Sequence, residues 1–314
     1  MSTDANALIV VKPITITDAM LITSGSPPAT NVPENDYAVW NSGTTYSLGD
    51  RVILTSTHKI YESLQAANTN KDPTTEFLWW VEVSPTNRWA AFDTSVSTAT
   101  AQGNNITYLL QPNQLVNTVA ALNVSGCSEL NITMTSASAG SPGIVYQKTV
   151  DFTAFPASAD WYSWFFVTRS PPKQAVEFGL PAYIDAEIEF EFIGGSALSV
   201  GTIILGAQAS FGLGIKYGAR VGIQDYSRKE TNDFGDVVLV QRAFAKRADV
   251  DLFIESSEVD SLQLFLSEVR AVPCLWVTST KYEATTLFGF YKNFDILISY
   301  PQHADCTLEI EGLS

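Results

Sequence analysis

Cysteine and histidine are scarce in this sequence of 314 residues. It has three cysteines, Cys127, Cys274 and Cys306, and two histidines, His58 and His303. A disulfide scaffold needs an even and dense set of cysteines, and a structural zinc site needs closely spaced pairs, so neither is expected. We expect free buried thiols, with one bridge among the three as the alternative, and no metal or cofactor.

Long apolar runs are missing as well. No stretch approaches the roughly 18–20 apolar residues that a membrane-spanning helix requires. Residues 1–6 show neither the basic nor the apolar region of a signal peptide. We therefore expect a chain that folds in the cytoplasm of its host cell and does not insert into a membrane.

Positive charge is in short supply: 18 Lys and Arg stand against 33 Asp and Glu, for a formal net charge of −15. Binding to nucleic acid or to an anionic membrane surface needs a basic face, so neither partner is expected. Aromatic residues, by contrast, make up 11% of the chain. That content excludes a disordered protein.

Alternation of apolar and polar residues dominates the chain after Asp93 and is typical of half-buried antiparallel strands. It is clearest in residues 130–135, 186–192 and 308–312, and residues 237–240 are a further strand candidate. Only residues 257–270 have apolar side chains at helical spacing, after a cap-like start at Ser257.

These patterns predict a mainly β protein in three parts. Residues 1–35 form an N-terminal arm and a linker rich in Ser, Pro and Asn. Residues 36–93 form a small aromatic-rich β-module, and residues 94–314 form a larger antiparallel β-sandwich with one short helix. A chain segment of about 50 residues has too little interior for an aliphatic core, so stacked aromatic rings substitute for one in the module.

The aromatic block has a recognisable order: Trp40, then Tyr46-Ser-Leu-Gly-Asp-Arg-Val52, then Tyr61, Pro73 and the pair Trp79-Trp80. It resembles the small carbohydrate-binding modules of families 5 and 12. The resemblance implies that Tyr37, Trp40 and Trp79 are candidate contacts for a glycan or a partner. Trp79 is the best candidate for an exposed ring, because neighbours on a strand point to opposite faces.

The block departs from those modules at one place. Their chitin-binding members carry adjacent exposed aromatic residues just after the position of Tyr61, whereas residues 64–67 here are Leu-Gln-Ala-Ala. The fold of the module is therefore expected without its usual sugar-stacking surface. For Trp40, Tyr46, Tyr61 and Trp80, a structural role in the module core is favoured over ligand contact.

The order of segments along the whole chain is similar to that of tailed-bacteriophage virion proteins. An apolar N-terminal segment precedes the module, the exit Asn87-Arg-Trp-Ala-Ala-Phe-Asp93 follows it, and residues 225–231 read Asp-Tyr-Ser-Arg-Lys-Glu-Thr. The resemblance implies a non-enzymatic component of the tail tip, baseplate or fibre adaptor. It would assemble with itself into a ring and with other tail proteins, and present the module to the host surface. In that arrangement, residues 1–23 would pack on a neighbouring subunit.

Basic residues are concentrated in one part of the sandwich region. They are candidate subunit contacts, because local basic spots on an acidic protein suit contacts between neighbouring copies; ordinary exposed charges are the alternative. The residues are Arg228, Lys229, Arg242, Lys246 and Arg247. The aromatic run at residues 161–167 is expected in the core, with a subunit interface as the alternative.

Two other functions remain open: a glycan-binding receptor-recognition protein, and a polysaccharide-degrading enzyme with a binding module. Glycoside hydrolysis needs two carboxylates flanking one bond. Glu187, Glu189 and Glu191 alternate along one predicted strand, and their spacing permits such a pair. The favoured interpretation is the solvated face of a strand, whose charges would also protect a sheet edge. Pairs at 249/251 and 309/311 receive the same interpretation, and both histidines are expected on the surface or in loops.

Overall fold

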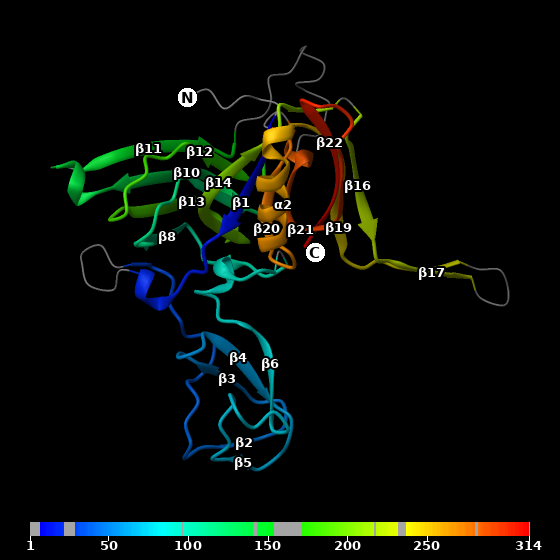
Figure 1. Cartoon of the computed structure of the whole chain (residues 1–314). Helices are drawn as coiled ribbons and strands as arrows, with labels where there is room; N and C mark the ends of the chain where they lie inside the picture. The colour runs from blue at the N-terminus through cyan, green and yellow to red at the C-terminus, as the bar shows by residue number, and fades with distance from the viewer. Residues whose placement is uncertain are drawn as a thin grey trace, which may run out of the picture.

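The computed structural model describes residues 7–21, 29–95, 97–140, 143–153, 171–216, 218–231, 237–279 and 282–313. These residues form antiparallel sheets with one α-helix, so the prediction of a mainly β fold is confirmed. Figure 1 shows a body made of two sheets and the helix, a small module that hangs from the body, and a two-stranded hairpin that projects away from it. None of the helices in the described ranges is long and apolar enough to cross a membrane.

The largest sheet of the body has ten strands: β1 (Leu8–Pro13), β9 (Thr118–Leu122), β12 (Ala175–Phe178), β14 (Thr202–Phe211), β15 (Gly214–Ile215), β16 (Arg220–Asp225), β19 (Phe244–Glu255), β20 (Cys274–Val277), β21 (Thr286–Leu297) and β22 (His303–Gly312). Their order is β12-β9-β14-β1-β20-β21-β22-β19-β15, and β16 also pairs with β19. Long β19 and β22 bury every second side chain along most of their length, which is the alternation seen in the sequence. In β21, by contrast, the first four residues are all buried and the rest are partly or fully exposed.

The second sheet of the body has five strands: β7 (Thr100–Ala101), β8 (Asn105–Leu110), β10 (Ser125–Thr135), β11 (Ile144–Asp151) and β13 (Glu187–Val200). β13 pairs with β10 on one side and with β8 and β7 on the other. Side chains such as Ile106 and Phe190 from this sheet meet Val119 and Leu205 of the larger sheet in one buried core. This half of the body is the predicted sandwich.

The helix α2 (Val259–Glu268) covers the other half of the same face of the ten-stranded sheet. Leu262 and Leu266 are buried against Val250 and Trp276. The predicted helix is present, but the cap predicted at Ser257 is wrong: Ser257 lies in a short 3-10 turn, Ser256–Glu258, and the N-cap residue of the helix is Glu258, which makes no side-chain cap bond. Further 3-10 turns lie at Asp18–Met20, Ala90–Phe92, Ala137–Ala139 and Glu283–Thr285.

The N-terminal segment differs from the expected arm. β1 lies in the middle of the ten-stranded sheet, between β14 and β20. Leu8, Val10 and Val11 are completely buried. A strand covered on both faces is apolar on both faces, which is why Leu8–Val11 do not alternate. Residues 8–13 therefore belong to the body, and the expectation that they pack on a neighbouring subunit is wrong.

The module consists of β2 (Thr45–Tyr46), β3 (Arg51–Leu54), β4 (Lys59–Ser63), β5 (Asn68–Thr69) and β6 (Trp80–Pro85). They form a three-stranded sheet, β3-β4-β6, and a two-stranded sheet, β2-β5. Gly49, at a φ of +86°, allows the turn between β2 and β3.

Aromatic side chains fill the core of the module. Tyr46, Tyr61 and Trp80 are buried together with Val52. The rings of Tyr46 and Trp80 meet edge to face with centroids 5.2 Å apart, a favoured geometry for aromatic pairs. Their predicted structural role is therefore confirmed.

The projecting hairpin is formed by β17 (Arg228–Thr231) and β18 (Val237–Val240), which pair only with each other among the described strands. It follows β16 and leads back into β19 at the outer edge of the ten-stranded sheet. The aromatic run at 161–167 lies outside the described residues.

Candidate binding surfaces

Trp79 does not occupy the exposed position predicted for it. Its backbone N–H donates to Glu76 O at 2.9 Å in a turn that ends just before β6, so strand alternation does not apply to the Trp79-Trp80 pair. The Trp79 ring packs against the buried cluster of the module, and the ammonium of Lys71 lies 5.4 Å from the ring centroid. Both tryptophans thus serve the module core.

Tyr37 and Trp40 lie on the chain segment that enters the module. Trp40 packs against the same buried cluster, and its Nε1 is buried without a hydrogen-bond partner among the described residues. Tyr37 is 39% exposed, and its hydroxyl accepts a hydrogen bond of 3.3 Å from Arg51. Of the three candidate contacts, Tyr37 alone presents much of its ring to solvent.

The most exposed apolar side chains of the module were not predicted. Phe77 is 73% and Leu78 is 81% exposed, directly before Trp79. Leu64, the residue at the position of the missing sugar platform, is 43% exposed beside them. Its N–H donates to Trp79 O at 2.8 Å, and the Gln65 side chain donates to Leu78 O at 2.9 Å.

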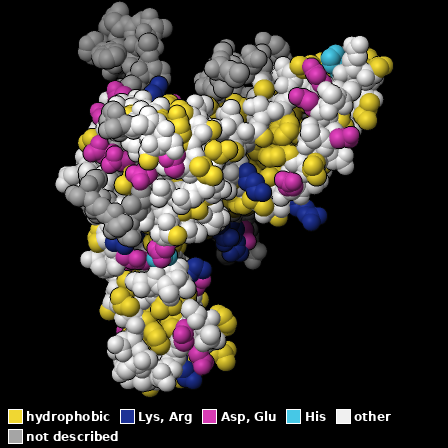
Figure 2. Space-filling view, turned by 60° about the vertical axis from the view of Figure 1, so that its left-hand side comes forward, with side chains coloured by type: hydrophobic (Ala, Val, Ile, Leu, Met, Phe, Trp, Pro, Cys, Tyr) yellow, Lys and Arg dark blue, Asp and Glu magenta, His cyan; other side chains and the backbone are white. Residues whose placement is uncertain are grey.

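We call Leu64, Phe77 and Leu78 the apolar tip of the module. Figure 2 shows apolar side chains gathered on the surface of the module, below the narrow junction with the body. A sequence signal existed: two large apolar residues follow the polar stretch 70–76 and precede two tryptophans that already fill the core. A core as small as this one has no room for all four side chains.

The module is joined to the body by a polar cluster around His58, which was expected to be a surface or loop residue. His58 lies in the turn between β3 and β4, but its side chain is only 17% exposed. Its Nδ1 lies 3.0 Å from Glu34 and its Nε2 lies 2.9 Å from Asp18. Both carboxylates come from segments outside the module sheets.

Glu34 is the centre of this junction. Its side chain is 7% exposed, and it also accepts a hydrogen bond of 2.9 Å from the Thr86 hydroxyl. The guanidinium of Arg88 lies 3.7 Å from its second oxygen. A buried carboxylate is stable only when hydrogen bonds or opposite charges compensate it, and these three partners do so.

The predicted subunit contacts divide into two groups. Arg228 and Lys229 lie on β17 of the projecting hairpin, and Arg242 is exposed in the segment that leaves it. Lys246 and Arg247 lie on β19 in the body, and Arg247 is held by ion pairs with Asp249 at 3.1 Å and Glu309 at 3.2 Å. The structure thus places Arg228, Lys229 and Arg242 at the hairpin, and Lys246 and Arg247 apart from them on the body.

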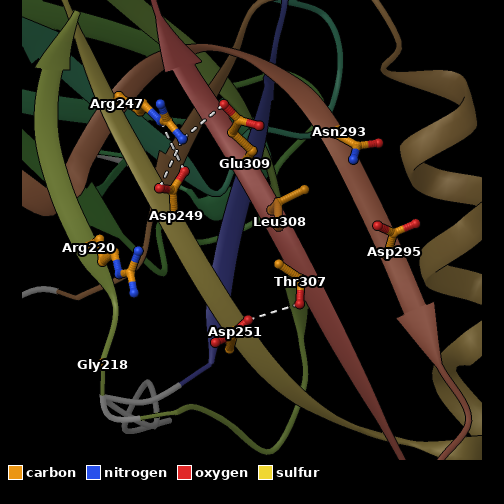
Figure 3. A pocket seen from close by; sticks show the side chains of 10 residues that line it. All are labelled: Gly218, Arg220, Arg247, Asp249, Asp251, Asn293, Asp295, Thr307, Leu308 and Glu309. Atoms are coloured by element: carbon orange, nitrogen blue, oxygen red, sulfur yellow. Dashed lines mark hydrogen bonds and ion pairs between the residues drawn. The ribbon is translucent and has the colours of Figure 1, made fainter.

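Arg247 belongs to a polar groove of about 320 Å³ on the face of the ten-stranded sheet away from α2. Figure 3 shows Arg247 reaching to carboxylates on two strands, β19 and β22. The hydrogen bond to Asp249, followed by the charges of that residue and Glu309, raises the pKa of Arg247. The charged residues that line the groove are Arg220, Arg247, Asp249, Asp251, Asp295 and Glu309.

The groove gathers side chains that the sequence presented as separate strand faces. Asp249 and Glu309 are paired with Arg247, and Asp251 accepts a hydrogen bond of 2.9 Å from the Thr307 hydroxyl. Three of the four carboxylates that line the groove therefore have a fixed partner. Among the described residues, no group of three His, Cys, Asp or Glu side chains is arranged to hold a metal ion. The groove is a polar and only partly neutralised surface.

Glu187, Glu189 and Glu191 lie on the outer face of β13, opposite the side chains that enter the sandwich core. β13 is an inner strand, between β10 and β8, so protection of a sheet edge is not the reason for these charges. Asn131 on β10 donates to Glu191 at 3.3 Å. The glutamates form a half-exposed polar face.

All three cysteines are free, as expected. Cys274 and Cys306 are buried, while Cys127 is only half-buried. Burial raises the pKa of Cys274 and that of Cys306 to about 11.

No family model matches the chain, and no curated protein matches its sequence significantly.

Proposed function

We propose that this protein is a structural, non-enzymatic component of a bacteriophage tail, at the tip, baseplate or fibre adaptor, where it assembles with itself and with other tail proteins and presents its small module to the host surface. The observation that carries the proposal is the module itself. It has a separate aromatic core, is attached through the His58 junction, and leaves an apolar tip in solvent.

The arrangement suits a protein that presents one part while another part assembles. Single exposed apolar residues are normal on a monomer, but adjacent ones such as Phe77 and Leu78 favour a contact surface. The body adds the exposed apolar hairpin, so two apolar surfaces of one chain lie on separate projections.

The test of location uses particles purified from the lysed host culture. Immunogold labelling, followed by electron microscopy of the intact particle, should place the chain at the host-facing end of the tail. A chain that is absent from purified particles, or is found in the head, would overturn the proposal.

The test of the module uses particles that carry Phe77→Ser and Leu78→Ser. We expect them to adsorb to host cells at least tenfold more slowly than unmodified particles, because the apolar tip is the proposed contact with the host surface. The module itself should stay folded, since both side chains are exposed and lie outside its buried core. Val39→Ser is the matched control: Val39 is 54% exposed and pairs with Ile53, at the opposite edge of the three-stranded sheet. If the tip variant adsorbs as fast as the Val39→Ser control, the apolar tip is not the contact with the host surface.

Direct glycan recognition is the second candidate function. The exposed ring of Phe77 supports it, because sugar rings stack on exposed aromatic faces, and we propose Phe77 instead of the partly buried Trp79 as the glycan contact. Glycan-array binding that is lost in Phe77→Ala but kept in Phe77→Tyr would support it. An array without any bound glycan would leave a protein as the partner of the tip. If reducing ends were released from host polysaccharide, and this release depended on Glu189, the result would support the polysaccharide-degrading enzyme instead.

A further inference from the structure

The projecting hairpin exposes an unusually apolar strand. The side chains of β18 are 63%, 51%, 69% and 45% exposed at Val237, Val238, Leu239 and Val240. A strand that is apolar on both faces is normally covered on both faces, as β1 is in this chain. β18 has the composition of a buried strand in an exposed place.

The two strands of the hairpin differ in how their outer edges are protected. β17 carries Arg228, Lys229 and Glu230, with ion pairs from Arg228 to Glu230 at 2.5 Å and from Lys229 to Asp225 at 3.0 Å. Charged side chains, Lys above all, discourage further strand pairing at an edge. β18 has no charged residue and pairs only with β17 among the described strands, so its outer edge is open to another strand.

Exposed apolar residues continue from the hairpin to its base. Ile223 on β16 is 64% exposed, Phe244 at the start of β19 is 53% exposed, and Tyr226 between the strands is 44% exposed. A two-stranded hairpin alone is marginally stable in water. The hairpin and its base together make one surface that gains stability when a partner covers it.

Charge indicates which partner fits. Residues 218–246 contain five Lys or Arg and four Asp or Glu, in a chain whose formal net charge is −15. The hairpin segment is thus slightly basic, while the rest of the same chain is strongly acidic, so the body of a second copy is electrostatically complementary to it. A nucleic acid would also be acidic, but it does not cover an uncharged apolar strand edge.

We propose that the hairpin of one copy docks on the acidic body of a second copy, where β18 is covered and pairs along its free edge. The contact is head to tail, because a slightly basic hairpin gains charge complementarity from the acidic body of a second copy and none from a second hairpin. Head-to-tail contacts close into rings when the rotation permits. The contact would supply the oligomer of the proposed tail component, but it requires only a second copy and no virion.

The test measures the mass of the purified full-length chain by light scattering after gel filtration, over a range of concentrations. We expect the unmodified chain to form oligomers, and the double variant Val238→Asp, Leu239→Asp to stay monomeric at concentrations at least tenfold higher. Folding of the body is not at risk, because Val238 and Leu239 are both exposed on the hairpin and pack in no buried cluster of the described residues. Leu264→Asp is the matched control, since Leu264 is 64% exposed on α2, and it should assemble as the unmodified chain does.

Hydrogen exchange identifies the surface directly. The amides of residues 237–240 should be protected in the oligomer and exchange at least tenfold faster in the unmodified chain once it is diluted to the monomer. A strictly monomeric unmodified chain, or a double variant that assembles normally, would overturn the head-to-tail contact. Immunogold labelling tests the tail location separately, so either proposal can fail while the other stands.

Discussion

The imidazole ring of His58 stacks on the indole of Trp89, with ring centroids 4.1 Å apart and an angle of 21° between the planes. His58 belongs to the module, whereas Trp89 lies on the chain that leaves it and is buried in the core of the sandwich. The same imidazole bonds Glu34 and Asp18. One side chain therefore connects the module to the body through a ring contact and two polar contacts.

Replacing His58 should loosen this junction. His58→Ala removes the stacking contact and one partner of the buried Glu34 carboxylate, and we expect a loss of about 1–2 kcal/mol in the free energy of unfolding. Limited proteolysis should cut near residues 85–95 faster than in the unmodified chain. Lys59→Ala is the control in the module, because its ion pair with Glu82 is exposed and contributes at most about 1 kcal/mol. Equal effects of the two changes would contradict the role of His58.

Gly289 should not tolerate a side chain. A Cβ at this position would lie 2.1 Å from Glu311 O on the neighbouring strand, so Gly289→Ala must push β21 and β22 apart. We expect a loss of about 1–3 kcal/mol in urea unfolding, the usual range for overpacking. Gly222→Ala on β16 is the matched control, since no atom lies within 4 Å of its Cβ, and it should be neutral. A Gly289→Ala variant as stable as the control would refute this packing.

The three thiols should differ in reactivity. In the native chain at pH 8, a disulfide reagent such as DTNB should modify Cys127 first, because it is half-buried while Cys274 and Cys306 are buried. Burial also raises the pKa of the two buried thiols to about 11, so they hold little thiolate at that pH. In urea all three should react. Cys127→Ser should abolish the first phase, and a native chain with two rapidly reacting thiols would contradict the assignment.

Stability should fall at alkaline pH through two tyrosines. Burial and the neighbouring Glu177 carboxylate raise the pKa of Tyr146 to about 12, and burial raises the pKa of Tyr108 well above its usual value. Above about pH 10 the unfolded chain ionises these hydroxyls while the folded chain keeps them protonated. Their contribution is therefore complete below pH 10, and that of Tyr146 is lost between about pH 10 and 12. Urea midpoints at pH 8, 10 and 11 should fall less steeply in Tyr146→Phe; an unchanged slope would exclude this tyrosine as a cause.

Local sequence patterns were sufficient to predict those strands and that helix which bury one face at a regular spacing. Alternation predicted β10, β13 and β22, helical spacing predicted α2, and the aromatic block predicted a module with a ring-filled core. Each of these signals follows from side-chain periodicity, which the sequence contains in full.

Contacts between distant segments were decided only by the tertiary structure. Residues 8–13 were expected in an arm that packs on a neighbouring subunit, because an apolar segment beside a linker looks the same whether its partner strands lie on its own chain or on another. The turn before β6 packs the partly buried Trp79 ring against the module core and leaves Phe77 and Leu78 in solvent. His58 gained its role from contacts with Glu34 and Trp89. The scarcity of cysteine, histidine and positive charge determined by itself that no disulfide scaffold was to be expected and that the chain is acidic. The positions of its few basic residues and of its exposed apolar side chains were decided by the pairing of strands that are remote in sequence. Local spacing contains no signal for which strands pair.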